Sequence, residues 1–155
     1  MKKIAVFFLF LTGIFMSVIP VKGQAVRADD ILGFWLNEEK DAKIEITIVN
    51  GKYFGKIVWL EEPNETTGLA KVDDQNPEPS LQNRPIMGLE LLKNFVFDED
   101  EWNSGTIYDP DNGKTYDCYM WFDGDENKMT LKGYVLGMKF VGRAEDWTRE
   151  AELRN

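Results

Sequence analysis

The stretch KIEITIVNGKYFGKIVWL, residues 43–60, decides the fold class. Its first half alternates isoleucine with polar residues, which is the period of a strand with one buried face. Asn50-Gly51 follows, and this dipeptide is the strongest short signal for a two-residue hairpin turn because both positions must tolerate positive φ. The stretch therefore predicts an antiparallel β-hairpin.

A turn at Asn50-Gly51 also sets the register of this hairpin. The predicted cross-strand pairs are Val49–Lys52, Ile48–Tyr53, Ile46–Gly55 and Glu45–Lys56. Opposite charges then lie across from each other on the polar face, which supports the register. The other face collects apolar side chains that we expect to enter the core: Ile44, Ile46, Ile48, Tyr53, Ile57 and Trp59.

Strands joined by turns recur along the rest of the chain. Turns are predicted at 109–113 and 123–126, where aspartate, asparagine, proline and glycine cluster. Further strands are expected at 31–36, 91–97, 102–108, 116–122, 128–132 and 138–148, and short helical turns at 27–32 and 85–93. The sequence thus predicts an all-β domain, an antiparallel up-and-down barrel of about eight strands, because closure leaves no exposed edge.

The N-terminal segment has the order of residues that is typical of a secretory signal peptide. Lys2 and Lys3 precede an apolar run from Ile4 to Ile19, and small residues follow near Gly23. The run is shorter than the ~20 apolar residues of a transmembrane helix. We expect residues 1–23 to be removed and residues 24–155 to form a single domain in the periplasm or outside the cell, with no membrane span.

Composition excludes several classes of function. The formal charge is −9 and becomes −12 without Lys2, Lys3 and Lys22, which opposes binding to nucleic acids. The sequence has no histidine, so serine–histidine and cysteine–histidine catalysis are excluded and the commonest zinc ligand is missing. The single cysteine, Cys118, is expected to be a buried, inert thiol. We expect a non-enzymatic protein without a metal or other cofactor.

Both ends of the predicted domain carry a known pattern. Gly33-Phe34-Trp35 opens the first strand, and GRAEDWTR, residues 142–149, closes the last. This arrangement resembles the lipocalin-like (calycin) barrel, in which a basic side chain of the last strand crosses the tryptophan of the first. The resemblance implies that Trp35 and Arg143 close one end of the barrel, with a guanidinium stacked on the indole.

Three longer blocks carry a second resemblance. They are NPEPSLQNRPIMGLELL (76–92), GTIYDPDNGKTY (105–116) and LKGYVLGMKFVGRAEDWTR (131–149). They resemble the secreted bacterial domain-of-unknown-function family 2147. The resemblance implies the barrel fold and an envelope or extracytoplasmic location, and it assigns no activity.

About thirty residues separate Leu60 from Leu91, far more than a hairpin needs. Apolar residues and three prolines between positions 73 and 92 favour an ordered flap over a disordered loop. Asp73 and Arg84 are a predicted ion pair that would fasten it. The flap is either a structural cover or a lid over a ligand site, and the sequence leaves both open.

Candidate ligand-binding residues are the aromatic and charged side chains expected at the interior or its rim. They are Trp35, Tyr53, Trp59, Arg84, Tyr108, Asp109, Tyr116, Arg143 and Trp147. Each also has a structural interpretation, because small barrels can be filled by their own side chains and Asp109 could simply cap its turn.

Three functions are compatible with this sequence. The first is binding of a small apolar or amphipathic molecule. The second is an interaction or structural role in the cell envelope, with a filled barrel that contacts a partner protein through the flap and the outward Tyr119 and Trp121. The third, a carboxylate-based hydrolase, has the least support because no inward pair of acids is recognisable. An apolar cavity of ~300 Å³ or more would favour the first.

Overall fold

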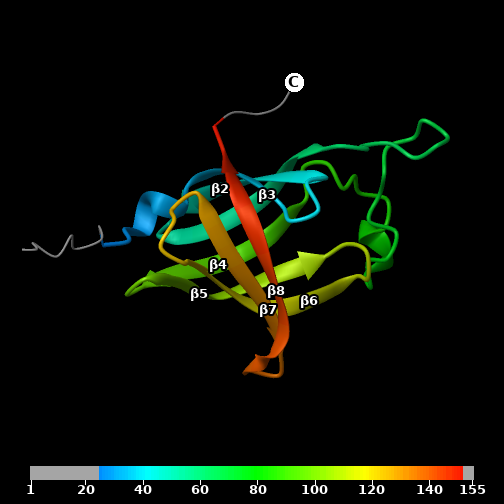
Figure 1. Ribbon diagram of the computed structural model, residues 1–155. Coiled ribbons are helices and arrows are strands. Elements are labelled where there is room, and N and C mark those ends of the chain that lie inside the picture. The colour runs from blue at the N-terminus through cyan, green and yellow to red at the C-terminus, as the bar shows by residue number, and fades with distance from the viewer. Residues whose placement is uncertain (1–24, 152–155) are drawn as a thin grey trace, which may run out of the picture.

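The computed structural model describes residues 25–151, which form a closed barrel of eight antiparallel strands (Figure 1). The strands are β1 (Gly33–Leu36), β2 (Ala42–Val49), β3 (Lys52–Leu60), β4 (Glu90–Asp98), β5 (Glu101–Asp109), β6 (Lys114–Phe122), β7 (Lys128–Val135) and β8 (Met138–Glu150). Each strand pairs with the next, and β8 pairs with β1. The predicted up-and-down barrel is confirmed, whereas the predicted signal peptide, residues 1–23, lies outside the described residues.

The β2–β3 hairpin has the predicted register from Val49–Lys52 to Glu45–Lys56. A register shift between Lys43 and Ile44 then brings Trp59 opposite Lys43. Cross-strand partners share a face and consecutive residues do not, so Trp59 lies on the face opposite to Ile44. The prediction that Trp59 points into the barrel is therefore wrong, because a β-bulge inverts the alternation. Ile48, also predicted inward, is 43% exposed at the end of the hairpin.

The described residues also contain two short 3₁₀ helices, η1 (Ala28–Ile31) before β1 and η2 (Pro79–Leu81) between β3 and β4. The helical turn predicted at 27–32 is confirmed. The one predicted at 85–93 is wrong, because β4 already begins at Glu90. Leu92 is fully buried against Gly55 of β3, where an added Cβ would lie 2.7 Å from the leucine side chain. This contact between strands is not visible in the local sequence pattern.

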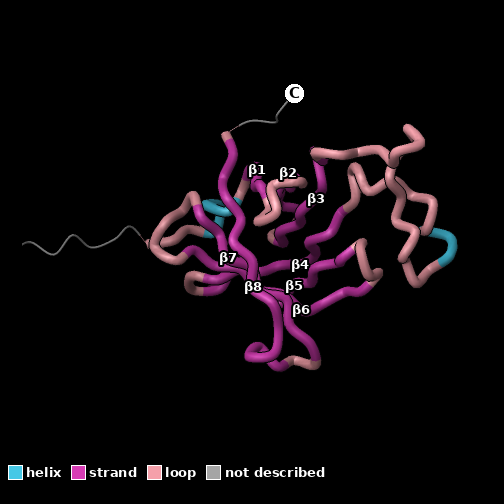
Figure 2. The backbone as a smooth tube through the Cα atoms, turned by 45° about the vertical axis from the view of Figure 1, so that its right-hand side comes forward, coloured by secondary structure: helices cyan, strands magenta, loops and turns pink. Residues whose placement is uncertain are grey.

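The barrel has two different ends, which Figures 1 and 2 show at opposite sides of the molecule. One end carries η1, and we call it the closed end. The other carries residues 61–89, the flap, together with the β1–β2 and β5–β6 turns, and we call it the open end. The β7–β8 turn lies apart from the flap, at the bottom of Figure 1. Every candidate residue can be assigned to one end or to the outer wall.

Aromatic side chains fill the closed end. The Trp102 ring lies 5.0 Å from both Phe97 and Phe122, between ring centroids, and Trp35 stacks on Phe122 at 5.9 Å. Phe95 lies directly over Gly105, where a Cβ would come within 2.3 Å of the phenyl ring. Only glycine leaves room for that ring, so this part of the barrel is packed without space for a ligand.

The N-terminal turn η1 plugs this end through its carbonyl groups. Trp35 Nε1 donates a hydrogen bond of 2.8 Å to the Ile31 carbonyl, and Trp102 Nε1 donates one of 3.0 Å to the Ala28 carbonyl. Tyr53 Oη donates to Asp29 Oδ1 at 3.3 Å. The first strand and the barrel core are thereby joined to η1 by polar contacts that are buried or partly buried.

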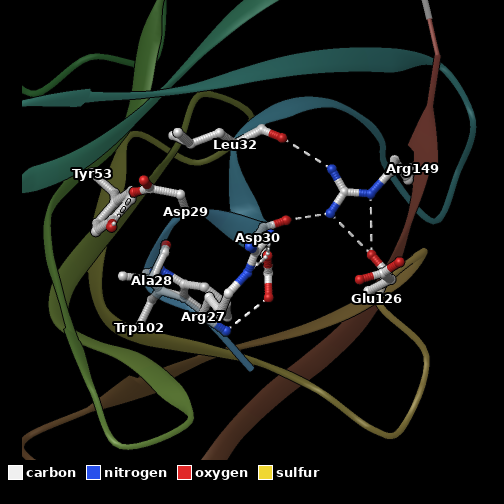
Figure 3. A network of polar contacts seen from close by, with 9 residues as sticks. All are labelled: Arg27, Ala28, Asp29, Asp30, Leu32, Tyr53, Trp102, Glu126 and Arg149. Atoms are coloured by element: carbon white, nitrogen blue, oxygen red, sulfur yellow. Dashed lines mark hydrogen bonds and ion pairs between the residues drawn. The ribbon is translucent and has the colours of Figure 1, made fainter. Parts of the chain in front are cut away.

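Arg149 of β8 latches the closed end (Figure 3). Its guanidinium lies 4.3 Å from the centroid of the Trp35 ring and donates to the carbonyls of Asp30, Leu32 and Glu126. The β1–β8 register explains the choice, because it pairs Trp35 with Arg149.

The prediction that Arg143 closes this end is wrong. Arg143 lies six residues earlier on β8, about 20 Å away along the strand at 3.3 Å per residue. Its side chain is 71% exposed at the open end and forms ion pairs with Glu39 and Glu145. A short motif indicates that a terminal arginine meets the tryptophan, but only the strand register determines which one.

Arg149→Ala is expected to lower the free energy of unfolding by about 2–3 kcal/mol, because it removes a cation–π contact and charged hydrogen bonds to three carbonyls. Arg143→Ala, the matched control on the same strand, should change it by less than about 0.5 kcal/mol, since exposed ion pairs contribute little. Urea denaturation followed by tryptophan fluorescence measures both. Equal effects of the two variants would contradict the latch.

Three further side chains, Cys118, Tyr119 and Trp121, lie outside the packing of the closed end described above. Cys118 is fully buried and free, and burial raises the pKa of its thiol to about 12, so the predicted inert thiol is supported. On the outer wall, Tyr119 stacks on Trp121 and lies 4.3 Å from Lys139 Nζ. These two rings are half-buried by each other and by Lys139.

Candidate functional site

A cavity of about 1190 Å³ occupies the open end of the barrel. Its innermost lining is apolar and consists of buried side chains from five strands: Ile44, Ile57, Leu91, Leu131 and Trp147. Ile107 and Tyr116 lie beside Gly133, each about 3.6 Å from where a glycine Cβ would be. Because residue 133 is a glycine, this part of the interior stays open, whereas aromatic rings fill the interior at the closed end.

The flap forms one wall of this cavity. Its backbone is ordered by internal hydrogen bonds, such as Asp73 N to the Arg84 carbonyl at 3.0 Å, and by Gly88 N to the Ile57 carbonyl of β3 at 2.9 Å. Flap residues that line the cavity are Glu61, Glu62, Glu65, Lys71, Val72, Asp74, Gln75 and Ile86. The predicted order of the flap is confirmed, while its role as a lid stays a prediction.

Asp73 anchors the flap to the barrel. Its buried carboxylate accepts hydrogen bonds from Tyr108 Oη at 2.6 Å, Asn76 Nδ2 at 2.8 Å and Arg84 Nε at 2.8 Å. Burial by itself raises the pKa of Asp73, but these hydrogen bonds and the Arg84 charge more than offset it, so the pKa lies below its ordinary value. The predicted Asp73–Arg84 ion pair is present, at 2.7 Å.

The β5–β6 turn forms the second support of the flap. Asp109 caps this turn, because its carboxylate accepts hydrogen bonds from Asp111 N at 3.0 Å and Asn112 Nδ2 at 2.7 Å. Gly113 has φ +68°, and a Cβ there would lie 1.9 Å from the Gln75 carbonyl oxygen of the flap. Glycine is therefore required at position 113 for two reasons: the positive φ of the turn and the close contact with the flap backbone.

Glu145 is a partly enclosed acid of the cavity, with a side chain that is 24% exposed. One carboxylate oxygen lies 3.4 Å from Arg143 Nε, and the other accepts a long hydrogen bond of 3.4 Å from Trp147 Nε1. Burial raises the pKa of Glu145, and Glu39 and Glu38 raise it further, while the Trp147 hydrogen bond and the Arg143 charge oppose this.

The structure brings together five of the nine candidate residues. Tyr108, Asp109, Tyr116, Arg143 and Trp147 all line the cavity. Trp35 and Tyr53 belong instead to the packed closed end, and Trp59 lies on the outer face. Arg84 is an anchor of the flap beside a separate pocket of about 200 Å³.

The sequence interpretation missed Glu145, although a signal was available. Arg143, Glu145 and Trp147 are two residues apart on β8, so they share a face. Once Trp147 is placed on the inner face, Glu145 must point inward as well, because the two residues share a face. Glu39 and Asp41 of the β1–β2 turn also line the cavity, and no local pattern indicated them.

Two negative findings apply to residues 25–151. This part of the chain contains no group of three or more cysteine, aspartate or glutamate side chains arranged to hold a metal ion. It also contains no helix with the length and apolar character needed to cross a bilayer.

The fold has a counterpart among solved structures. Protein HP1028 from the human pathogen Helicobacter pylori, described as belonging to the lipocalin family, superimposes with a TM-score of 0.69. The match covers 82% of this chain and 85% of that one, at 22% sequence identity, and so it shows a shared fold. No curated protein matches this sequence.

A family assignment follows from the sequence between the two ends of the barrel. Residues 33–149, from the first residue of β1 to the latch arginine of β8, match the family described as uncharacterized protein conserved in bacteria (DUF2147). The chain therefore belongs to the DUF2147 family and has a lipocalin-like barrel.

Proposed function

We propose that this protein is a non-enzymatic binding protein for a small amphipathic molecule and that it works outside the cytoplasm, in the periplasm or beyond. The single observation that carries the proposal is the cavity of about 1190 Å³ at the open end. Its volume exceeds the ~300 Å³ of the smallest ligand sites, and its apolar floor lies beneath a polar rim, which is the usual form of such sites.

The distribution of side chains supports an amphipathic ligand over a purely apolar one. Buried aliphatic and aromatic residues form the floor, while carboxylates, tyrosines and amides form the rim. An apolar group of the ligand would lie against Ile57 and Leu131, and its polar end would remain near the flap. A barrel filled throughout, which the envelope-structural alternative requires, does not fit this open end.

The location rests on the N-terminal sequence, because residues 1–23 have the pattern of a secretory signal peptide. Native mass spectrometry of the protein purified from its own cells tests both parts of the proposal. We expect an N-terminus near residue 24 and an added mass from a co-purifying small molecule.

Ile107→Trp should block ligand binding, because the larger ring would occupy the space beside Gly133. Ile48→Trp, at the exposed end of the β2–β3 hairpin, is the control for added bulk away from the cavity. The co-purifying mass should disappear in Ile107→Trp and persist in Ile48→Trp. A protein that carries no small molecule, and whose melting temperature is unchanged by a lipid and metabolite panel, would contradict the binding function.

A further inference from the structure

Charged side chains are distributed unevenly around the cavity. Its lining contains nine carboxylates and two basic side chains, Lys71 and Arg143. Both bases are already paired with carboxylates of the same lining, Lys71 with Glu62 at 3.7 Å and Arg143 with Glu39 at 2.9 Å. A cavity with walls of low dielectric concentrates such a field, so its interior attracts cations and repels anions.

The apolar floor adds a second feature that suits a cation. Tyr116 and the buried Trp147 lie in the same cavity as Glu145, and the faces of such rings attract ammonium and guanidinium groups. The Glu145 carboxylate is also incompletely compensated, since its contacts with Arg143 and Trp147 are both 3.4 Å long. A cationic group placed there would gain a close ion pair in a partly dehydrated site.

A bare metal ion fits this arrangement less well. Among the described residues, the acids do not converge into a group that could ligate a metal. The carboxylates are spread around a large cavity with an apolar floor, which matches an organic cation with an apolar body.

We propose that the ligand is an organic cation, an amine or a guanidinium attached to an apolar chain or ring, and that the Glu145 carboxylate pairs with its charged group. This inference rests on the proposed function, because it names the chemical class of the ligand in the same cavity. Carboxylate and phosphate amphiphiles are disfavoured by the same field.

Three probes with one ten-carbon chain test the inference: decylammonium, decanol and decanoate. Binding is measured below micelle-forming concentrations by isothermal titration and by tryptophan fluorescence. We expect decylammonium to bind about tenfold or more tightly than decanoate, and to weaken as salt rises from about 0.05 to about 0.5 M, because salt screens the attraction.

Glu145→Gln is the decisive variant, because the amide keeps the shape of the side chain and removes its charge. It should weaken decylammonium binding about tenfold while leaving decanol binding unchanged, since a charged hydrogen bond contributes about that much. Asp98→Asn is the matched control, with one charge removed from the exposed end of β4 at the opposite end of the barrel. It should leave all three probes unchanged.

The outcomes separate the two proposals. Equal binding of the three probes, tighter binding of decanoate, or equal losses in Glu145→Gln and Asp98→Asn would overturn the cationic ligand and leave the binding function standing. Absence of binding by all three probes, together with absence of a co-purifying molecule, would overturn both.

Discussion

Trp35→Ala is expected to lower the free energy of unfolding by about 3–5 kcal/mol, the usual cost of removing a large buried aromatic ring. Trp35 is fully buried, and its ring contacts both the core and the latch. It stacks on Phe122, and the Arg149 guanidinium lies over it in a cation–π contact. Its Nε1 also holds the Ile31 carbonyl. Alanine would leave a cavity and an unsatisfied carbonyl at the point where β1 meets β8.

Two variants make this result specific. Trp35→Phe keeps an aromatic ring but loses the hydrogen bond to Ile31, so its cost should lie between those of the wild type and Trp35→Ala. Phe140→Ala removes a ring that is 81% exposed and should change stability by less than about 0.5 kcal/mol. Urea denaturation provides the three values. A Trp35→Ala protein as stable as Phe140→Ala would be incompatible with closure at β1 and β8.

The parts of the fold that were predictable from sequence are those determined locally. The Asn50-Gly51 turn sets the hairpin register because a two-residue loop leaves no freedom for the pairs beside it. Gly113 and Asp109 were likewise assigned to their turn by residue type. Longer-range pairing was predictable only in outline, so the meeting of the first and last strands was expected while the choice of Arg149 over Arg143 was not.

The candidate site was harder to predict because it depends on side-chain size at facing positions. Inward residues alternate in the same way along a filled and a hollow barrel. Only the complete register shows that rings such as Trp102 and Phe95 gather at one end, while Leu131 and Gly133 lie at the other. The bulge at Lys43 had a similar effect, because one extra residue moved Trp59 to the outer face.

The second large effect is expected from Asp73→Ala, which should lower the free energy that holds the flap on the barrel by about 3 kcal/mol. Removing one member of a buried, charged network deprives its partners of the carboxylate to which they donate. Those partners are Tyr108 on β5, and Asn76 and Arg84 on the flap. The neighbouring Asp74→Ala is the control, because Asp74 is exposed and bonds only locally, to Gln75.

Hydrogen exchange followed by mass spectrometry locates the effect. Amides of residues 61–89 should exchange faster in Asp73→Ala, while those of β5 to β8 keep their protection, because the barrel retains its own ladder of hydrogen bonds. Faster exchange across the whole barrel, or none beyond that of Asp74→Ala, would show that Asp73 is not a local anchor of the flap.

Acid should loosen the flap in the same way. The folded-state pKa of Asp73 lies below its ordinary value of 3.8, so its contribution to stability is present above that value and is lost as the pH falls through the folded-state pKa. Flap exchange, corrected for the intrinsic pH dependence of the amide rate, should therefore rise below about pH 4 in the wild type. Asp73→Asn, which has no carboxylate to titrate, should lack this step.

The Asp73→Ala variant also separates the two roles of the flap. If the flap is a lid, a bound ligand should be released faster from Asp73→Ala than from the wild type. If the flap is a structural cover, the release rate should be unchanged.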